Sequence, residues 1–407
     1  MMQQAEKNSF DIVIVGGGIV GLSLANELAG SDFSVAVVEK NELKSITDEP
    51  DCRVSAINLS ALKRFQQTGV LNSALAERIC AFEKMFVWER AGAGQIEFDS
   101  AELGVPELGV IVENNVLQQM LIDSIQSADN ISYICPQEIS AIDYQPADEM
   151  PADTTVVLSA GDSSAEKRLT AKLLVGADGV NSKVREVALI QRVRHPYQQQ
   201  GLVCNVATSM SHQHTAWQCF MPSGPLAFLP LYNGWSSIVW SLDETLAQQY
   251  LALDDEAFKL ALAEAGEFRL GEILEVSQRF LFPLSHGHVD EYVKPGLALI
   301  GDAAHNIHPL AGQGANLGIA DAFALADVIV AAKKAGRQWS ALHTLKKYQR
   351  QRKGANLLME TSMTGFKQLF GYENAFLAEI RNAGLSLVDH LPAVKYRIIR
   401  QAIGETL

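Results

Sequence analysis

The stretch Phe10–Glu39 reads FDIVIVGGGIVGLSLANELAGSDFSVAVVE, and it decides the fold of the chain. One apolar run precedes the glycines, and a second, Ser34–Val38, leads directly into Glu39. Because the residues between them have a helix-like pattern, the order is strand, glycine turn, helix, strand and acid. This order is typical of a dinucleotide-binding unit, whereas a lone glycine turn in an ordinary α/β domain is the alternative.

Each glycine of this turn has a predicted task. Gly16 allows the tight turn, Gly18 lets a pyrophosphate approach the backbone, and Gly21 lets the helix pack closely on the sheet. The amino end of the helix supplies N–H donors and a positive dipole end for the phosphates. Glu39 is expected to accept hydrogen bonds from an adenosine ribose.

Length and composition restrict the remaining possibilities. The 407 residues, of which 48% are hydrophobic, suffice for two domains or one large composite fold. No run of eighteen apolar residues occurs, so we expect no transmembrane helix, and the polar amino terminus lacks the pattern of a signal peptide. The five scattered cysteines indicate reduced thiols in a cytoplasmic protein, and no cysteine–histidine spacing predicts a metal site.

Charge is unevenly distributed. The net charge of −14 argues against nucleic acid as a partner. From Ala331 to Leu407, however, 13 lysines and arginines minus 5 acidic residues give +8, which leaves −22 for the rest of the chain. This asymmetry predicts either a basic face for a membrane surface or protein partner, or simply solvated helix faces.

The chain divides by pattern into three parts. Residues 1–80, 100–182 and 290–340 are predicted to form a discontinuous nucleotide-binding α/β domain, with helices expected at about 52–69, 112–125 and 314–334. Aromatic and alternating runs in 81–99 and 183–289, with a helix near 254–265, predict an inserted mixed α+β domain that binds the substrate. Residues 341–407 are expected to be helical.

Two further signatures follow the glycine turn. Gly176–Arg185 reads GADGVNSKVR, and Gly301–Gly318 reads GDAAHNIHPLAGQGANLG. With Gly16–Gly21 before them, they resemble in order and spacing the FAD-dependent aromatic hydroxylases, the group A flavoprotein monooxygenases with the p-hydroxybenzoate hydroxylase fold. The resemblance covers nearly the whole chain and implies a glutathione-reductase-type FAD domain, with NAD(P)H bound only transiently.

The resemblance also assigns cofactor contacts. Asp302 would bind a ribityl or ribose hydroxyl, Gly312 and Gly314 would let backbone approach the flavin pyrimidine edge, and Asp178 with Arg185 would serve FAD and NAD(P)H. Arg53 and Gln118 would reach the FAD region, although each taken alone reads as an ordinary surface residue. The expected FAD-binding residues are Gly16, Gly18, Gly21, Glu39, Arg53, Gln118, Asp178, Asp302, Gly312, Gly314, Ala315 and Asn316.

Finer matches lie within the family. CRVSAIN at 52–58, VENNVLQ at 112–118 and HPLAGQG at 308–314 look like the ubiquinone-biosynthesis hydroxylases, as do FKQLF at 366–370 and RNAGL at 381–385. LPAVK at 391–395 and IRQAIG at 399–404 are most similar to the VisC-type 2-polyprenylphenol (2-octaprenylphenol) hydroxylases. One departure is Ala315, where these relatives commonly carry a bulkier aliphatic residue.

The implied reaction is a monooxygenation. NAD(P)H would reduce FAD, O2 would add at C4a, and the hydroperoxide would transfer one oxygen atom to the ring of a polyprenylated phenol or quinol in ubiquinone biosynthesis. Pro309 is a better candidate than His305 for positioning the substrate ring. His305 is either a catalytic base or a structural hydrogen-bonding residue. A water-free cleft is expected. Its candidate lining residues, most of which we expect instead to be core of the inserted sheet, are Phe220, Phe228, Leu229, Pro230, Leu231 and Trp240.

Partners and alternatives remain open at this point. A membrane-resident substrate implies a cytoplasmic protein that contacts the inner membrane peripherally or joins a Ubi-type protein complex, with Lys395, Arg397 and Arg400 as contact candidates; a homo-oligomer is a further option. Halogenases of similar opening sequence carry a tryptophan-rich motif that is not found here. A polyprenyl reductase, a non-catalytic flavoprotein scaffold and a hydroxylase of another aromatic substrate are the competing functions.

Overall fold

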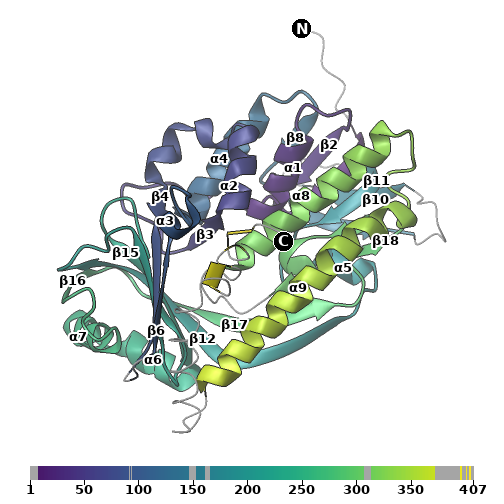
Figure 1. The fold of residues 1–407 in the computed structure, drawn as a ribbon. Coiled ribbons are helices and arrows are strands. Elements are labelled where there is room, and N and C mark those ends of the chain that lie inside the picture. The colour runs from purple at the N-terminus through teal and green to yellow at the C-terminus, as the bar shows by residue number, and fades with distance from the viewer. Residues whose placement is uncertain are drawn as a thin grey trace.

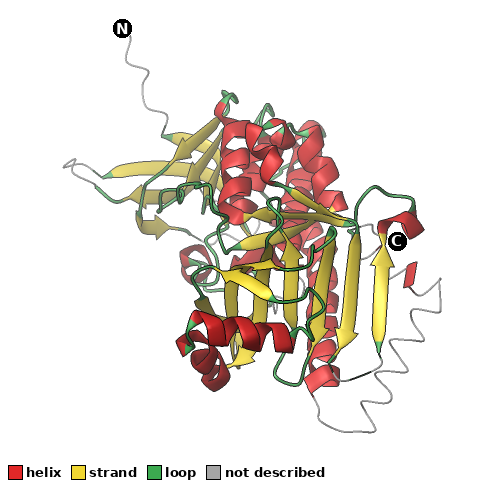
Figure 2. Ribbon diagram, turned by 90° about the vertical axis from the view of Figure 1, so that its left-hand side faces the viewer, coloured by secondary structure: helices red, strands yellow, loops and turns green. Residues whose placement is uncertain are grey.

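Two large β-sheets form the frame of the molecule. The computed structural model describes residues 8–90, 92, 94–145, 153–160, 166–306, 313–371, 395–396, 400 and 403–404. In Figure 1 the helices α1 (Ile19–Leu28), α4 (Asn114–Gln126) and α8 (Gln313–Lys334) gather beside the sheet that contains β2 (Val35–Val38). The strands β12 (Arg192–Thr208) and β15 (Ser236–Asp243) lie below them. Figure 2 shows the two sheets as separate groups of strands, each with its own helices. The predicted α/β fold class is confirmed.

The eight-stranded sheet carries the glycine turn. Its central order is β18-β19-β11-β1-β2-β8, in which β19, β11, β1, β2 and β8 run parallel. All four residues of β2 are buried, as expected for a parallel strand that is covered on both faces. The strands are β1 Ser9–Val15, β2 Val35–Val38, β8 Ile131–Ile134, β9 Ile139–Asp143, β10 Thr154–Leu158, β11 Lys167–Gly176, β18 Val293–Lys294 and β19 Leu297–Leu299.

The nine-stranded sheet is almost entirely antiparallel; the pairing of β13 with β5 is parallel. Its order is β20-β17-β12-β15-β14-β13-β5-β6, and β16 also pairs with β12. The strands are β5 Lys84–Glu89, β6 Gln95–Asp99, β12 Arg192–Thr208, β13 Thr215–Phe220, β14 Leu226–Pro230, β15 Ser236–Asp243, β16 Ile273–Val276, β17 Phe280–Val289 and β20 His305–Asn306.

A three-stranded antiparallel sheet, β3 Val54–Asn58, β7 Gly109–Glu113 and β4 Cys80–Phe82, completes the strands. The α-helices are α1 Ile19–Leu28, α2 Leu59–Gln67, α3 Ser100–Leu103, α4 Asn114–Gln126, α5 Lys183–Val187, α6 Glu244–Ala252, α7 Asp255–Ala265, α8 Gln313–Lys334 and α9 Leu342–Gly371. The short 3-10 helices are η1 Val70–Asn72, η2 Ala74–Arg78 and η3 Gly301–Ala303.

The expected helix over residues 52–69 is wrong in its first half. Residues 54–58 form β3, which pairs antiparallel with β7, and the helix α2 begins only at Leu59. Asn58 explains the boundary, because its side-chain oxygen accepts a hydrogen bond from the Ala61 N–H and caps the helix. The extended residues before Asn58 pair with β7, which is more than fifty residues away in the sequence, so the local sequence pattern does not predict this pairing.

The helix α8 has the length and composition of a membrane span, contrary to the expectation that no such segment exists. In the structure 61% of its most apolar window is buried inside the protein. The side chain of Val20, on α1, lies so close to Gly318 that a Cβ added to this glycine would be 2.6 Å from a Val20 methyl group. A core helix of a folded domain passes the same composition test, and α8 is packed as one.

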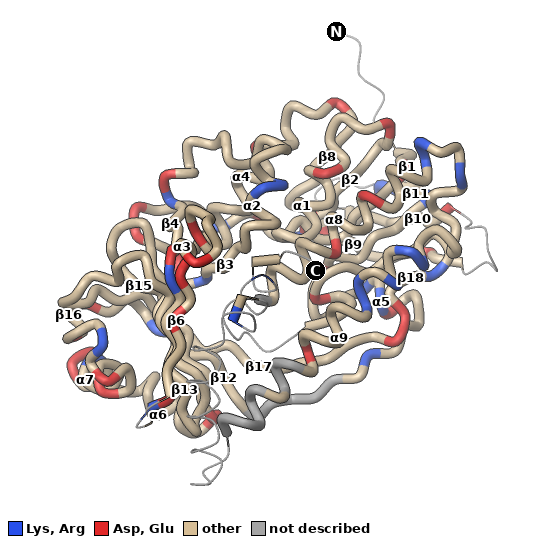
Figure 3. Tube along the Cα trace, viewed as in Figure 1, with Lys and Arg blue, Asp and Glu red and all other residues tan. Residues whose placement is uncertain are grey.

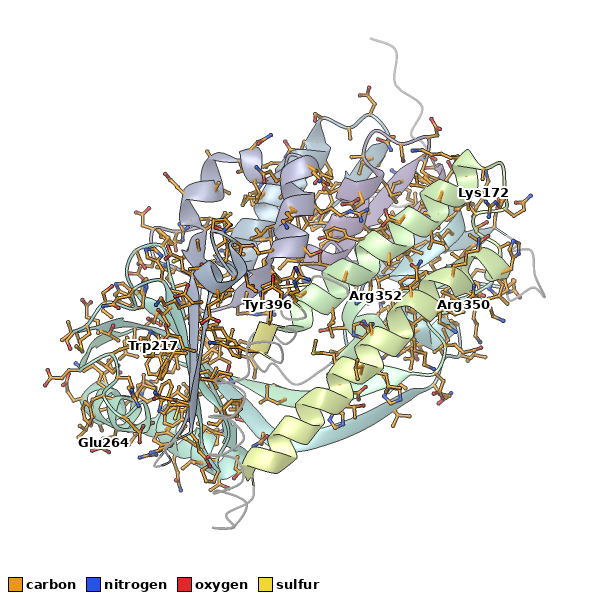
Figure 4. All side chains as sticks on the ribbon, in the orientation of Figure 1. Lys172, Trp217, Glu264, Arg350, Arg352 and Tyr396 are labelled. Carbon is orange, nitrogen blue, oxygen red and sulfur yellow. The ribbon has the colours of Figure 1, made fainter. Side chains whose placement is uncertain are left out.

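Two apolar cores correspond to the two large sheets. The larger contains the strands β1, β2 and β11 together with α1, α4 and α8, and it includes Ile12, Leu22 and Ile319 at 0% exposure. The second lies between the nine-stranded sheet and the helices α6 and α7, around Trp240 and Phe258. Trp217 marks this second region in Figure 4.

Candidate flavin site

The glycine turn between β1 and α1 has the geometry that its sequence predicts. Gly16 adopts a φ of +107°, and a Cβ there would lie 2.3 Å from the Ala177 carbonyl oxygen. A Cβ on Gly21 would lie 2.0 Å from the Gly16 carbonyl oxygen. At Gly18, by contrast, an added Cβ meets nothing within 4 Å. The turn is therefore tightly packed at both ends and open at the point where a diphosphate is expected.

Glu39 and Gln118 meet at this turn although they are 79 positions apart. A Glu39 carboxylate oxygen accepts the Gly17 N–H at 2.7 Å, and the other accepts the Asn41 N–H at 2.9 Å. Gln118, on α4, donates from Nε2 to the Gly17 carbonyl at 2.6 Å. Both predicted cofactor residues thus hold Gly17, Glu39 at its N–H and Gln118 at its carbonyl, and together they fix the conformation of the turn.

Asp178 and Arg185 lie where the second signature leaves β11. An oxygen of Asp178 accepts the Val184 N–H at 3.2 Å, and its other oxygen is buried without a hydrogen-bond partner. Burial raises the pKa of Asp178, against the lowering effect of these local hydrogen bonds. Arg185 donates to the Ala303 carbonyl at 3.0 Å and to the Val180 carbonyl at 2.8 Å, so it ties the second signature to the third.

Asp302 follows β19 at a sharp turn. Gly301 before it has a φ of +58°. Solvent reaches the Asp302 side chain, yet desolvation by the surrounding protein raises its pKa. His305, Arg192 and Arg53 act in the opposite direction, by charge. Arg53 and Arg192 therefore lie near enough to Asp302 to act on its carboxyl by charge.

Arg192 was missed by sequence reasoning, because it begins the strand β12 in a stretch without a recognisable motif. It donates to the Val180 carbonyl at 3.0 Å and hydrogen-bonds the Asn306 side chain. Asn306 donates in turn to the Ser285 carbonyl at 2.7 Å. Arg192 thus lies where both sheets and the third signature meet.

His305 belongs to a buried polar cluster. Its Nε2 contacts the Asp321 carboxylate, and its ring stacks on Tyr292 with centroids 5.7 Å apart. Asp321, at 0% exposure, also accepts from the Gly301 N–H at 3.1 Å and from Arg352 Nε at 2.7 Å. Arg352 reaches it from α9 (Figure 4). This arrangement favours the structural role that the sequence left open for His305.

The neighbouring cationic groups, not burial, determine the direction in which the pKa of Asp321 shifts. Burial alone would raise the pKa of its carboxyl, but His305 and Arg352 outweigh burial and hold that pKa below the ordinary value. Asn356 completes the set by donating to the second carboxylate oxygen at 3.1 Å. The segment from Gly301 to His305, which opens the third signature, is therefore anchored to the helices α8 and α9 at once.

The three predicted FAD-binding residues at the start of α8 lie in different surroundings. The Asn316 side chain accepts the Asn58 N–H at 3.0 Å and donates to the Ala56 carbonyl at 2.6 Å, so it joins α8 to β3. Ala315 packs against the larger of the two cores. A Cβ on Gly314 would meet nothing within 4 Å. The predicted residues Pro309 and Gly312 lie outside the described residues.

Most of the residues proposed to line the substrate cleft are buried in the two cores. This is the other interpretation that the sequence allowed for them. Phe228 and Trp240 are 4% and 1% exposed and belong to the second core, and Leu229 and Leu231 belong to the first. On β17, Phe282 is 37% exposed, and Arg53 lies 5.6 Å from its ring centroid. Within the described residues, no group of three His, Cys, Asp or Glu is arranged to hold a metal ion.

These residues fit a bound FAD. The open Gly18 at the helix start, the unpartnered buried oxygen of Asp178 and the solvent-facing Asp302 lie at the carboxyl ends of β1, β11 and β19. Since β11 pairs in parallel with both β1 and β19, these ends share one edge of the sheet. Such an edge is where α/β folds bind nucleotides.

Comparison with known proteins agrees with this site. An FAD binding domain family matches residues 9–361. The chain is 36% identical to the 3-demethoxyubiquinol 3-hydroxylase of Escherichia coli (strain K12), over 97% of this chain and 98% of that protein. It is 31% identical to a mitochondrial ubiquinone biosynthesis monooxygenase of Danio rerio, over 97% and 90% of the two chains.

Among solved structures, p-nitrophenol 4-monooxygenase from Pseudomonas putida has a similar fold. The TM-score is 0.78 with 18% identity, and the match covers 98% of this chain and 100% of that one. This likeness supports the fold, and the family match and the curated relatives supply the activity. The chain belongs to the FAD-binding-domain family and, within it, to the FAD-dependent monooxygenases related to the ubiquinone-biosynthesis hydroxylases.

Proposed function

We propose that this monooxygenase hydroxylates the aromatic ring of a polyprenylated phenol or quinol intermediate of ubiquinone biosynthesis, with NAD(P)H as reductant and O2 as oxygen source. The observation that carries the proposal is the 36% identity to the Escherichia coli 3-demethoxyubiquinol 3-hydroxylase over nearly the full length of both chains. Similarity of this extent includes both sheets, so it covers the cofactor side and the substrate side alike.

Bound FAD would supply the oxygen-transfer chemistry, and the protein's residues bind and orient it. Glu39 would meet the adenosine ribose, and the N–H groups at the start of α1, beside Gly18, would meet the diphosphate. Asp302 would hold the ribityl chain, with Arg53 and Arg192 beside it to balance its charge. Asp178 and Arg185 would serve at the FAD and NAD(P)H side, and the start of α8 would direct N–H groups at the ring.

We further propose that the protein meets its substrate at a membrane surface from the cytoplasm, or within a protein complex. The basic C-terminal region is less available for this contact than its sequence suggests. Lys395 is 8% exposed and pairs with Glu102 at 2.9 Å, Lys333 lies 3.6 Å from Asp11, and Arg352 is held by Asp321. Figure 3 shows lysines and arginines, with acidic residues among them, where α5, β18 and α9 adjoin.

The test is NAD(P)H oxidation by the FAD-loaded protein in air. Short-chain 2-polyprenylphenol and short-chain 3-demethoxyubiquinol are compared as substrates, and the product is weighed by mass spectrometry. We expect one of them to stimulate oxidation and to gain one oxygen atom, and the same reaction under nitrogen to give no such product. Saturation of a prenyl double bond without O2 would indicate a reductase instead.

A scaffold function predicts a different result. The protein would then hold FAD, yet neither compound would change the rate of NAD(P)H oxidation, alone or with partner proteins present. That outcome would overturn the proposed hydroxylation. Turnover of an unprenylated phenol in preference to both test compounds would contradict the substrate class and leave the monooxygenase activity intact.

A further inference from the structure

The loop of residues 41–53 runs between the two ends of the predicted FAD site. It begins just after Glu39, whose carboxylate holds the Gly17 N–H. It ends at Arg53, which is close enough to Asp302 to lower the pKa of that carboxyl by its charge. A loop of this length without helix or strand needs side-chain partners if it is to hold one conformation.

A buried glutamate and a half-buried arginine supply the first partners. Glu113, at the end of β7, is 1% exposed. One of its oxygens accepts the Asp51 N–H at 2.6 Å, and the other pairs with Arg78 Nη2 at 2.7 Å. Arg78 then donates to the Thr47 carbonyl at 2.5 Å. Because a buried charge is costly without its partner, this pair is a firm anchor for both halves of the loop.

The nine-stranded sheet supplies the second set of partners. Tyr232, in the turn between β14 and β15, donates its hydroxyl to the Asp48 carbonyl at 3.1 Å. The guanidinium of Arg78 lies 4.9 Å from the Tyr232 ring centroid. Asn205 of β12, at 1% exposure, donates from Nδ2 to the Pro50 carbonyl at 2.7 Å. The loop is therefore held between two different sheets.

Arg53 contacts the same two sheets, one through its backbone and the other through its side chain. Its carbonyl accepts the Asn114 N–H at 2.9 Å, which fixes its backbone beside β7 and α4. Its N–H donates to the Asp51 side chain at 3.1 Å. Its guanidinium, however, lies over the ring of Phe282, which belongs to the nine-stranded sheet. The position of the side chain thus depends on where that sheet lies relative to the loop.

We propose that residues 41–53 form a strap through which the nine-stranded sheet positions Arg53 beside the flavin, with Tyr232 and Asn205 as positioning residues. The inference rests on the role for Arg53 at the FAD, proposed above. It does not depend on which phenol is the substrate. Neither Tyr232 nor Asn205 belongs to a cofactor motif, and both bond the strap, so we expect their effect on FAD to pass through it.

The test is a double-mutant cycle on FAD affinity, measured by the quenching of flavin fluorescence as FAD is titrated into the apoprotein. Tyr232→Phe removes one hydroxyl and keeps the ring beneath Arg78. We expect it to weaken FAD binding by roughly 3- to 10-fold, the loss of about one hydrogen bond. In an Arg53→Met background the same change should alter FAD affinity by less than about twofold, because coupled residues are not additive.

Tyr144→Phe is the matched control. Tyr144 also donates its hydroxyl to a backbone carbonyl, that of Pro295, at 3.0 Å, but it is not bonded to the strap. It should leave FAD affinity unchanged in both backgrounds. Trypsin supplies a second readout, because cleavage after Lys44 should be faster in Tyr232→Phe than in the control. Asn205→Leu repeats the cycle from the other anchor if Tyr232→Phe folds poorly.

Three results would overturn the strap. An equal loss of FAD affinity on Tyr232→Phe with and without Arg53 would show that the tyrosine acts by another route. Unchanged affinity in Tyr232→Phe and Asn205→Leu would show that neither residue positions the loop. Unchanged affinity in Arg53→Met alone would remove the flavin role of Arg53 and the strap with it, while leaving the proposed hydroxylation standing.

Discussion

The two ends of the predicted FAD site are built in different ways. The adenosine end is built mainly from residues 16–39, one continuous stretch of glycines and backbone N–H groups, to which α4 adds the side chain of Gln118. The ring end is assembled from side chains that come from β12, α8 and α9, with Asp321 and Arg352 at its centre. Backbone sites need particular residues at fixed spacing, whereas side-chain networks need only complementary partners in space.

The carboxyl groups show the same contrast in their pKa values. Burial raises the pKa of Asp178 and of Asp302, although neighbouring donors and cations partly oppose it. The pKa of Asp321 is lowered in spite of its burial, because His305 and Arg352 more than compensate. Asp321 is a structural charge whose partners are already in place. Asp178 still has an oxygen available for a ligand.

The largest expected effect comes from breaking the ring-end network. Asp321→Asn leaves Arg352 and His305 without their buried counter-charge, so the free energy of unfolding should fall by about 3–5 kcal/mol. Urea denaturation of the apoprotein measures this change. FAD affinity should fall with it, because the Gly301–His305 segment loses its anchor.

Asp327→Asn is the control for that variant. Asp327 also pairs with an arginine, Arg64, at 2.6 Å, but 62% of its side chain is exposed. A surface pair of this kind contributes about 0–1 kcal/mol. Equal losses in Asp321→Asn and Asp327→Asn would mean that burial of the network is not what stabilises the ring end.

A pair of glycine variants separates packing from binding at the adenosine end. Gly21→Ala places a methyl group 2.0 Å from the Gly16 carbonyl oxygen, so it should cost about 1–3 kcal/mol of stability and abolish FAD binding. Gly18→Ala places its methyl group in open space. The apoprotein should therefore keep its unfolding midpoint but bind FAD more weakly. Destabilisation by Gly18→Ala would refute the assignment of this open side to the diphosphate.

A smaller effect is expected at Glu39. Its two oxygens accept two backbone N–H groups, and an amide in Glu39→Gln can accept only on one side. We expect FAD affinity to fall roughly tenfold, equivalent to about 1.4 kcal/mol, as measured by fluorescence titration of the apoprotein. If only stability fell and FAD affinity did not, Glu39 would be a turn residue without a cofactor contact.

The smallest effect is on the pH dependence of the apoprotein. Because the folded-state pKa of Asp178 is raised above 3.8, its contribution to stability is fully present below that pH and is lost as pH rises through the higher folded value. Asp178→Asn should therefore flatten the decline in unfolding free energy over this window. A decline as steep as in the unaltered protein would show that another group, such as Asp302, accounts for it.

These contrasts explain what the sequence could predict. The glycine turn, Glu39 and the helix α8 were readable because each depends on local spacing, and the structure places α8 at Gln313–Lys334 against an expected 314–334. The family and its cofactor were readable because three motifs recur in a fixed order. The roles of the individual FAD contacts remain predictions, which the variants above test.

The rest depends on contacts between distant residues. Nothing local marks Asp321 as the partner of His305 or Arg192 as a neighbour of Asp302, because both pairings arise only when α8 and β12 are in place. The strand β3 was taken for a helix since its apolar residues fit either period, and its pairing with β7 decided the outcome. Lys395 was a candidate contact residue for a membrane or partner, yet it is buried and paired with Glu102.

The close packing of α1 against α8 has a consequence for synthesis on the ribosome. The helix that carries the glycine turn, complete by Leu28, is covered by a helix that does not begin until Gln313. At roughly 5–20 residues per second, the first helix waits on the order of 15–60 seconds for its partner. During that time a nascent chain exposes the face of α1 that packs on α8, so we expect chaperones to protect this face until translation is nearly finished.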